Sequence, residues 1–193
     1  GHRDAGAKAE EWIPIRPATD RLFAMSMSYV LVNEGLCDFA FLRKDTNAPY
    51  LVGPDQYFVR DQERQIYVWD AKDNRAKLWN DPSIDSANLA LEGEYLVNGV
   101  KCRPAFQVYK DILKDASPEA MEKYTTVPAA TVWRIAREFA KEARIGETMT
   151  LPDGRTVPYR PAAYNYYRGA QGHKTGMQTN QAFQLVNMLV GNI

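Results

Sequence analysis

The sequence predicts an α/β fold interrupted by a β-rich insertion, and three patterns support this prediction. Apolar residues at helical spacing occur before residue 43 and again between residues 104 and 142. Between residues 43 and 103, short runs rich in aromatic and β-branched residues alternate with polar turns. From residue 163 onward, a predicted strand, a glycine-rich turn and a helix follow one another, which is the order of an α/β unit.

The N-terminal part begins with an extended stretch at residues 12–17, because its two prolines fix φ and disfavour helix at the residues before them. Thr19 then supplies an N-cap, and Asp20 an acidic first turn, for a helix that runs through Asn33 and stops at Gly35. The many apolar residues of this helix leave it little polar face. We therefore expect it to be sandwiched between other elements.

Residues 43–103 are predicted to form an inserted antiparallel meander or a long structured loop. The expected strands are residues 50–52, 57–59, 66–69, 78–79 and 95–97. Four aromatic residues here allow two interpretations, a local core or a recognition surface, and a local core is the commoner role in short strands; they are Tyr57, Tyr67, Trp69 and Trp79.

The rest of the chain, with residues 1–42, forms the predicted α/β portion at 1–42 and 104–193. Pro104 favours the first turn of an amphipathic helix, and the residues after Pro128 show the clearest surface-helix pattern. Residues 147–159 are expected to form a hairpin, because Pro152 presets φ and Gly154 accepts positive φ in the turn. A last helix is predicted over residues 177–190.

Composition excludes several classes of site. The chain carries 24 basic and 24 acidic residues, and this balance argues against a nucleic-acid partner, which requires clustered positive charge. Cys37 and Cys102 stand far apart without a CxxC or Cys/His partner, so no zinc or iron–sulfur site is expected within this chain. Both cysteines are interpreted as buried small apolar residues.

The glycine-rich turn carries the first candidate site. Gly169, Gly172 and Gly176 give GxxGxxxG, which matches neither the dinucleotide-binding GxGxxG nor the phosphate-binding GxxxxGK[ST] motif. Gln171 and His173 project from the same turn and concentrate hydrogen-bonding groups where the open N-terminus of the following helix favours a polar or anionic ligand. The alternative is that the glycines shape the turn and that His173 is a satisfied structural residue.

The second candidate site is the stretch Arg16–Asp20. Asp20 either caps the helix that it opens or turns outward, where its two carboxylate oxygens suit the N1 and N2 donors of a guanine. No nucleophile–base pair, paired carboxylates or metal-ligand cluster is found in the sequence, so no metal-binding residue is predicted. Any reactive group has to come from a cofactor or from sequence outside this chain.

With these residues in view, the chain resembles catalytic subunits of the dimethyl sulfoxide reductase family, molybdenum or tungsten enzymes that hold a bis-molybdopterin guanine dinucleotide cofactor. Residues 7–22 are similar to that family's "A-D-x-W-I-P-I-R-P-G-T-D" segment. Residues 168–176, a helix and Gly191-Asn192-Ile193 are similar to its "G-x-x-Q-H-x-x-G... L-x-G-N-I" segment. Residues 46–51 and the helix after Val127-Pro128 are also similar, so the resemblance spans nearly the whole chain.

The resemblance implies a fold and a set of site residues. The α/β portion becomes part of a Rossmann-like three-layer sandwich that binds molybdopterin guanine dinucleotide. Arg16, Thr19 and Asp20 would bind the guanine and ribose end of one cofactor arm. Gln171, Gly172 and His173 would line the pterin and metal region, with His173 as the candidate catalytic residue.

Two positions depart from the family pattern: Ala18 replaces the usual glycine, and Gly172 separates Gln171 from His173. The resemblance further implies an internal segment, inactive by itself, of an oxidoreductase. Its remaining domains would supply the ligand of the metal and a 4Fe-4S cluster.

The implied activity is two-electron redox in anaerobic respiration, by oxygen-atom transfer or reduction of sulfur compounds, with thiosulfate, polysulfide or tetrathionate reductases as the nearest subgroup. The expected partners are a membrane anchor and an electron-transfer subunit with iron–sulfur clusters, in a periplasmic or membrane-associated complex. Two alternatives stay open: a non-redox hydratase or transhydroxylase of the same family, and a non-catalytic nucleotide-binding scaffold.

Overall fold

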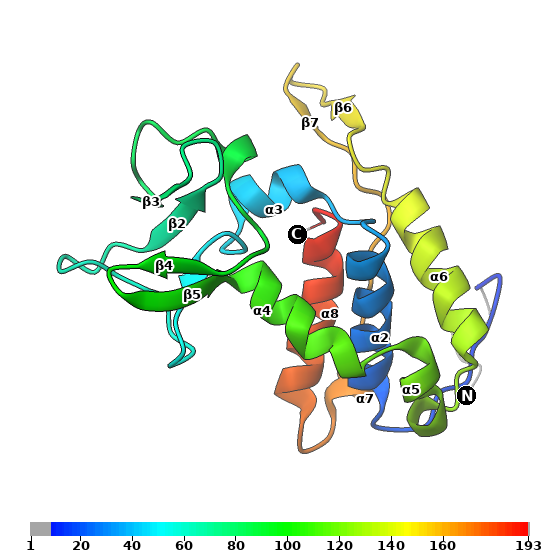
Figure 1. Ribbon diagram of the computed structural model, residues 1–193. Coiled ribbons are helices and arrows are strands. Elements are labelled where there is room, and N and C mark those ends of the chain that lie inside the picture. Colours follow the sequence, from blue (N-terminus) through cyan, green and yellow to red (C-terminus); the bar gives the residue numbers. More distant parts are fainter. Residues whose placement is uncertain (1–8, 193) are drawn as a thin grey trace.

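Residues 9–192 are described by a computed structural model, in which long helices gather on one side and short strands on the other (Figure 1). Three residues of the sequence motifs, Ala7, Lys8 and Ile193, lie outside the described residues. Within residues 9–192, no helix combines the length and the apolar character that crossing a bilayer requires.

The helix α2 (Asp20–Asn33) lies at the centre of the helical side. It packs against α5 (Pro118–Thr125), α6 (Ala129–Glu142) and α8 (Gly176–Leu189), and residues on several of its faces are buried. The bounds of α2 and its position between other helices confirm what its apolar sequence predicts. The residues of all four helices contribute to the main hydrophobic core of the chain.

Shorter helices connect this core to the rest of the chain. Asp38 caps the first of them by accepting a hydrogen bond from the Phe41 backbone N–H at 3.0 Å, and Ser117 caps α5 by accepting one from the Ala120 N–H at 3.2 Å. The remaining helical elements are α3 (Phe39–Asp45), η1 (Ser86–Asn88), α4 (Ala105–Ile112), η2 (Leu113–Asp115) and α7 (Arg168–Gln171).

The described strands form three small sheets, each of them antiparallel. The strands are β1 (Leu51–Val52), β2 (Tyr67–Asp70), β3 (Arg75–Leu78), β4 (Tyr95–Val97), β5 (Val100–Pro104), β6 (Thr148–Thr150) and β7 (Thr156–Pro158). Their order is β1-β5-β4 in one sheet, with β2-β3 and β6-β7 as separate pairs. The fold is therefore mixed α/β, but residues 9–192 contain no parallel sheet and do not by themselves form a Rossmann-like sandwich.

The strand predicted at residues 163–167 is wrong. This segment joins no sheet, and side chains from α8 and from the residues after it bind its backbone instead. The Tyr164 N–H donates to Asn187 Oδ1 at 2.7 Å, Asn187 Nδ2 donates to the Tyr164 carbonyl at 3.0 Å, and Asn192 Nδ2 donates to the Ala162 carbonyl at 2.6 Å. The predicted strand at residues 57–59 likewise reduces to one bridge, between Val52 and Phe58.

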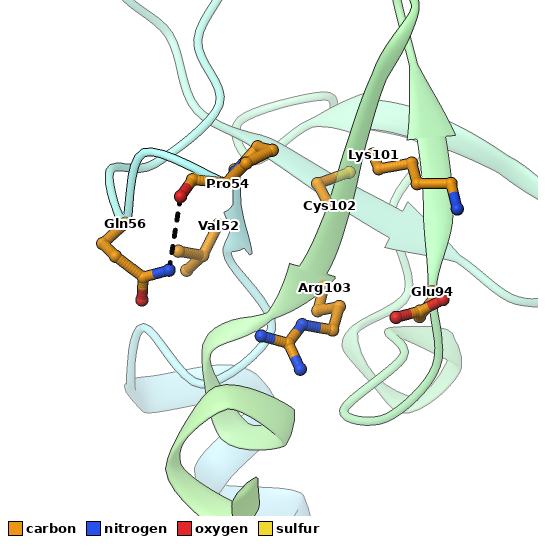
Figure 2. A pocket seen from close by; sticks show the side chains of 8 residues that line it. Val52, Pro54, Gln56, Glu94, Lys101, Cys102 and Arg103 are labelled. Carbon is orange, nitrogen blue, oxygen red and sulfur yellow. Dashed lines mark hydrogen bonds between the residues drawn. The ribbon is translucent and has the colours of Figure 1, made fainter. Parts of the chain in front are cut away.

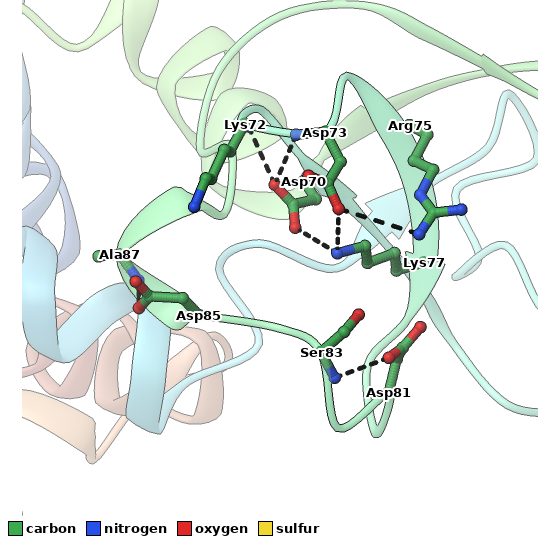
Figure 3. A network of polar contacts seen from close by, with 9 residues as sticks. All are labelled: Asp70, Lys72, Asp73, Arg75, Lys77, Asp81, Ser83, Asp85 and Ala87. Carbon is green, nitrogen blue, oxygen red and sulfur yellow. Dashed lines mark hydrogen bonds and ion pairs between the residues drawn. The ribbon is translucent and has the colours of Figure 1, made fainter.

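The β-rich part has a small core of its own, around Leu51, Val97 and Cys102. Tyr67 and Trp69 pack against this core, whereas Tyr57 and Trp79 are largely exposed. Beside it, the buried Lys77 ammonium lies 2.7 Å from the Asp70 carboxylate and 2.6 Å from that of Asp73 (Figure 3). Hydrogen bonding to Lys77 lowers the pKa of Asp70, and these bonds raise the pKa of Lys77, so the cluster is a fixed ion-pair network that holds the β2–β3 hairpin.

Candidate functional site

The two stretches predicted to form a site begin helices that run in the same direction. Figure 1 shows α2 and α8 side by side with their first turns at the same end of the molecule, and α7 beside them. Tyr164 connects them, because its ring lies 6.5 Å from that of Phe23 on α2 and stacks on Phe183 of α8 at 4.8 Å. Burial and the nearby Asp20 charge both raise the pKa of Tyr164. Asp20 and the segment that leads into the glycine-rich turn are therefore neighbours.

The stretch Arg16–Asp20 forms a tight turn before α2. The Arg16 carbonyl accepts hydrogen bonds from the Thr19 N–H at 3.2 Å and from the Thr19 hydroxyl at 2.6 Å. Thr19 therefore stands at the predicted N-cap position, but its side chain binds backward and does not cap the helix. The Asp20 carboxylate accepts no hydrogen bond from residues 9–192, which leaves it able to meet an external donor.

Ala18 explains why a glycine suits this turn. Its φ is 65°, in the left-handed region, where a Cβ is unfavourable. The backbone thus adopts at residue 18 the conformation that glycine adopts without strain. The departure from the family pattern changes the stability of the turn and leaves its shape intact.

Of the three glycines in the predicted turn, only Gly176 is required by close packing. A Cβ at Gly176 would lie 2.0 Å from the Gln171 carbonyl oxygen, far inside van der Waals contact. A Cβ at Gly169 would meet open space, and one at Gly172 would only touch the Arg168 carbonyl at 3.4 Å. Gly176 therefore lets the end of α7 lie directly against the beginning of α8.

His173 is held by hydrogen bonds inside this turn. Its Nδ1 accepts from the Thr175 N–H at 3.3 Å, and its Nε2 lies 3.0 Å from the Ala170 carbonyl. These partners assign the tautomer with the proton on Nε2, which donates to that carbonyl. Both ring nitrogens thus have structural partners, and the catalytic role of His173 stays a prediction.

A stripe of amides on α8, which the sequence interpretation missed, fixes the segment opposite it. Asn180 Nδ2 donates to Gln171 Oε1 at 2.5 Å, and Gln184 Nε2 donates to the Tyr166 hydroxyl at 3.2 Å. Asn187 binds the Tyr164 backbone as described above. The spacing i, i+4 and i+7 of these three amides is visible in the sequence and places them on one face of a helix. That spacing is the signal that would have found them.

The charge at this end of the molecule is positive. Residues 16–21 and 168–176 each contribute two Lys or Arg side chains, four in total, against the single carboxylate of Asp20. None of these four cations pairs with a carboxylate among the described residues. Neither α2 nor α8 has a side-chain cap at its N-terminus, so two helix ends with uncapped backbone N–H groups add to the positive potential.

A buried ion pair at the opposite end of α8 was also missed. Arg160 Nη2 lies 2.6 Å from Asp38 Oδ2, with the two side chains 10% and 8% exposed, and Arg160 Nε donates to the Val190 carbonyl at 3.2 Å. Gly191 lies against this pair, since a Cβ there would be 2.9 Å from Asp38 Oδ2. The pair joins residues 122 positions apart, and local sequence gives no signal for such a contact.

The clearest cavities lie elsewhere. Figure 2 shows a hollow of about 210 Å³ on the β-rich part, where Lys101, Arg103 and Glu94 meet the loop after β1. Arg103 is paired with Asp111, and burial raises the pKa of the Cys102 thiol, so this hollow presents no activated nucleophile. Among the described residues, no group of three or more His, Cys, Asp or Glu side chains is arranged to hold a metal ion.

Comparison with known proteins gives a consistent set of relatives. The chain is 31% identical to the large chain of sulfite dehydrogenase from Allochromatium vinosum over 97% of its own length and 22% of that protein. It is 29% identical to the alpha chain of perchlorate reductase from Dechloromonas aromatica over 69% of its length and 19% of the relative. It is 28% identical to dimethyl sulfoxide reductase DmsA of Escherichia coli over its whole length and 17% of that protein.

The chain thus spans about a fifth of the length of the curated relatives that it matches. No profile of a known protein family matches it. The similarity to these relatives nevertheless covers most of the chain and includes both stretches described above. The chain belongs to the molybdopterin oxidoreductase catalytic subunits of the dimethyl sulfoxide reductase family.

Proposed function

We propose that this chain works within the catalytic subunit of a molybdopterin oxidoreductase, where it holds part of a bis-molybdopterin guanine dinucleotide cofactor. The proposed activity of the whole subunit is two-electron redox, by oxygen-atom transfer or by oxidation or reduction of a sulfur compound. The cofactor, with Mo or W, supplies the redox chemistry when it is bound. The proposed task of this chain is to bind and orient it.

One observation carries the proposal, namely that the uncapped N-termini of α2 and α8 open side by side. Backbone N–H groups at a helix N-terminus bind phosphate and other anions. The four cations of residues 16–21 and 168–176 increase the attraction for a pyrophosphate group. These features suit an anionic dinucleotide, and the cofactor class of the family is of that kind.

The proposed roles follow the placement of the residues. Thr19 and Asp20 stand at the beginning of α2, where the free Asp20 carboxylate would accept hydrogen bonds from the N1 and N2 donors of a guanine. Arg16 shapes this turn through its carbonyl and brings a positive charge to it. Gln171, Gly172 and His173 lie just before α8 and would line the pterin end.

The rest of the subunit is part of the proposal. The helices α2, α6 and α8 would cover a Rossmann-like sheet whose strands come from sequence outside residues 9–192. The relatives are named as subunits of reductases and a dehydrogenase. We accordingly propose that an iron–sulfur subunit exchanges electrons with the catalytic subunit.

Titration with GDP and ADP tests the guanine site directly. We expect the chain to bind GDP more tightly than ADP, and Asp20→Asn to weaken GDP binding about tenfold, because a charge-assisted hydrogen bond contributes about 1.5 to 3 kcal/mol. ADP binding should change little. Asp45→Asn, at a carboxylate at the end of α3, is the matched control. Equal GDP affinity in the Asp20 and Asp45 variants, or equal affinity of the parent chain for GDP and ADP, would contradict the assigned site.

A further inference from the structure

The hairpin β6–β7 stands apart from both cores of the molecule. Figure 1 shows it projecting beyond the end of the helical side. All residues of β6 are exposed, Met149 to 43%, and β7 is half-buried only at Val157. A two-stranded hairpin without a packing partner has marginal stability in water. This exposure suggests that the hairpin is completed by contact with a further stretch of polypeptide.

The hydrogen bonds of the hairpin fix which backbone groups point outward. The Leu151 N–H donates to the Arg155 carbonyl at 2.8 Å, and the Tyr159 N–H donates to the Glu147 carbonyl at 2.9 Å. Hydrogen-bonded and non-hydrogen-bonded pairs alternate along an antiparallel ladder. The pairs Thr148↔Pro158 and Thr150↔Thr156 are therefore the non-hydrogen-bonded ones, and their backbone groups face away from the hairpin.

The two outer edges differ in what they offer. On the β7 edge, Pro158 has no N–H group to donate, and proline is a common guard of exposed edges. On the β6 edge, Thr148 and Thr150 each present one N–H and one C=O, and neither proline nor a charged residue interrupts the strand. Threonine also has high strand propensity. Only the β6 edge is therefore suited to pairing along its length.

We propose that the β6 edge receives an added β-strand from another part of the catalytic subunit, which extends this hairpin into a three-stranded sheet. This inference rests on the proposed function, in which the chain works inside such a subunit. The fitting segment is an extended, uncharged stretch whose backbone pairs with Thr148 and Thr150 and whose side chains pack beside the two threonines.

The size of the edge selects this occupant over a separate chain. Two threonines with two backbone groups each allow four hydrogen bonds. Stable complexes between separate chains bury about 1,200 to 2,000 Å², which a strand of three residues cannot supply. A segment of the same subunit is held nearby by its connections, and a short edge then suffices. The relatives, about five times as long as this chain, contain ample sequence for such a segment.

Amide hydrogen exchange tests the proposal, with the chain alone compared with the complete catalytic subunit that carries it. We expect the Thr148 and Thr150 amides to exchange about 100-fold more slowly in the subunit, while the Thr156 amide on the β7 edge keeps its rate. Thr150→Pro should remove the protection of Thr148, whereas Thr156→Pro, its cross-strand neighbour, should preserve it. Both prolines stand at non-hydrogen-bonded positions and cost the hairpin no internal hydrogen bond.

Three results would overturn the proposal. Equal exchange of Thr148 and Thr150 in the two samples would show that nothing pairs with β6. Protection of Thr156 in place of Thr150 would assign the wrong edge, and protection that grows with the concentration of the chain alone would assign a second copy as the occupant. GDP binding is read at the other end of the helices, so failure of the hairpin proposal and failure of the proposed function give different results.

Discussion

Gly176 gives the sharpest test of how α7 and α8 fit together. In Gly176→Ala, the new methyl group would lie 2.0 Å from the Gln171 carbonyl oxygen and 2.9 Å from its carbonyl carbon. Ordinary contacts of this kind begin near 3.4 Å, so the last turn of α7 has to move by more than 1 Å. Overpacking at a well-fitted site costs about 1 to 3 kcal/mol. Because backbone has to move, we expect about 2 kcal/mol of destabilisation after the small helix-propensity gain of alanine.

Gly169→Ala is the matched control, since this glycine lies in α7 with open space around its Cα. We expect it to be neutral or to stabilise the chain by up to about 1 kcal/mol, through the higher helix propensity of alanine. Urea denaturation measures both variants. For a chain of this size, a loss of about 2 kcal/mol also lowers Tm by about 4 to 8 °C. Equal unfolding free energies for the two variants would refute the close approach of Gln171 to Gly176.

Three further substitutions probe other parts of the molecule. Ala18→Gly should stabilise the chain by about 1 kcal/mol in urea denaturation, because residue 18 has a φ of 65°; a loss of stability would contradict that conformation. Asp38→Asn should cost about 3 kcal/mol in the same assay, since it leaves the buried Arg160 charge without its partner, and a loss below about 1 kcal/mol would show that the pair is not buried. Burial raises the pKa of Tyr109 to about 12 from an ordinary value of 10, so the neutral phenol is favoured in the folded state and its stabilising effect, complete below pH 10, is lost as pH rises toward 12. Tyr109→Phe should therefore weaken the alkaline decline by on the order of 2 kcal/mol; identical pH profiles of unfolding would argue against the buried hydroxyl.

Elements with strong local signals were predictable from sequence. The bounds of α2 follow from its apolar run, Asp20 at the start and Gly35 after the end. The β6–β7 hairpin follows from the turn residues Pro152 and Gly154, and the β4–β5 hairpin from Asn98-Gly99, where φ is positive at both residues. In each case a few neighbouring residues determine the conformation.

The segment 162–167 shows where local reasoning fails. Its side chains alternate between half-buried and exposed, as in a strand, and the prediction of extended backbone was correct. The pattern reports which side chains face the core, but it does not report what the backbone groups bind. Here Asn187 on α8 supplies the hydrogen bonds that a neighbouring strand would otherwise supply. Without that strand, the predicted α/β unit becomes an extended segment held against a helix.

The candidate site was predicted in part for the same reason. The sequence singled out Asp20 and the turn around His173, and both lie at the end where α2 and α8 begin. It did not predict that both ring nitrogens of His173 would be engaged by the turn itself. That outcome depends on the exact path of the backbone between α7 and α8, which Gly176 permits and no local pattern specifies.

Backbone amide chemical shifts of the labelled chain, recorded during GDP titration, test the shared site most directly. If the beginnings of α2 and α8 form one binding site, the amides of residues 20–22 and 171–178 shift together and yield the same dissociation constant. Shifts confined to one of the two stretches, or found mainly in residues 43–103, would contradict a single nucleotide site at the paired helix N-termini.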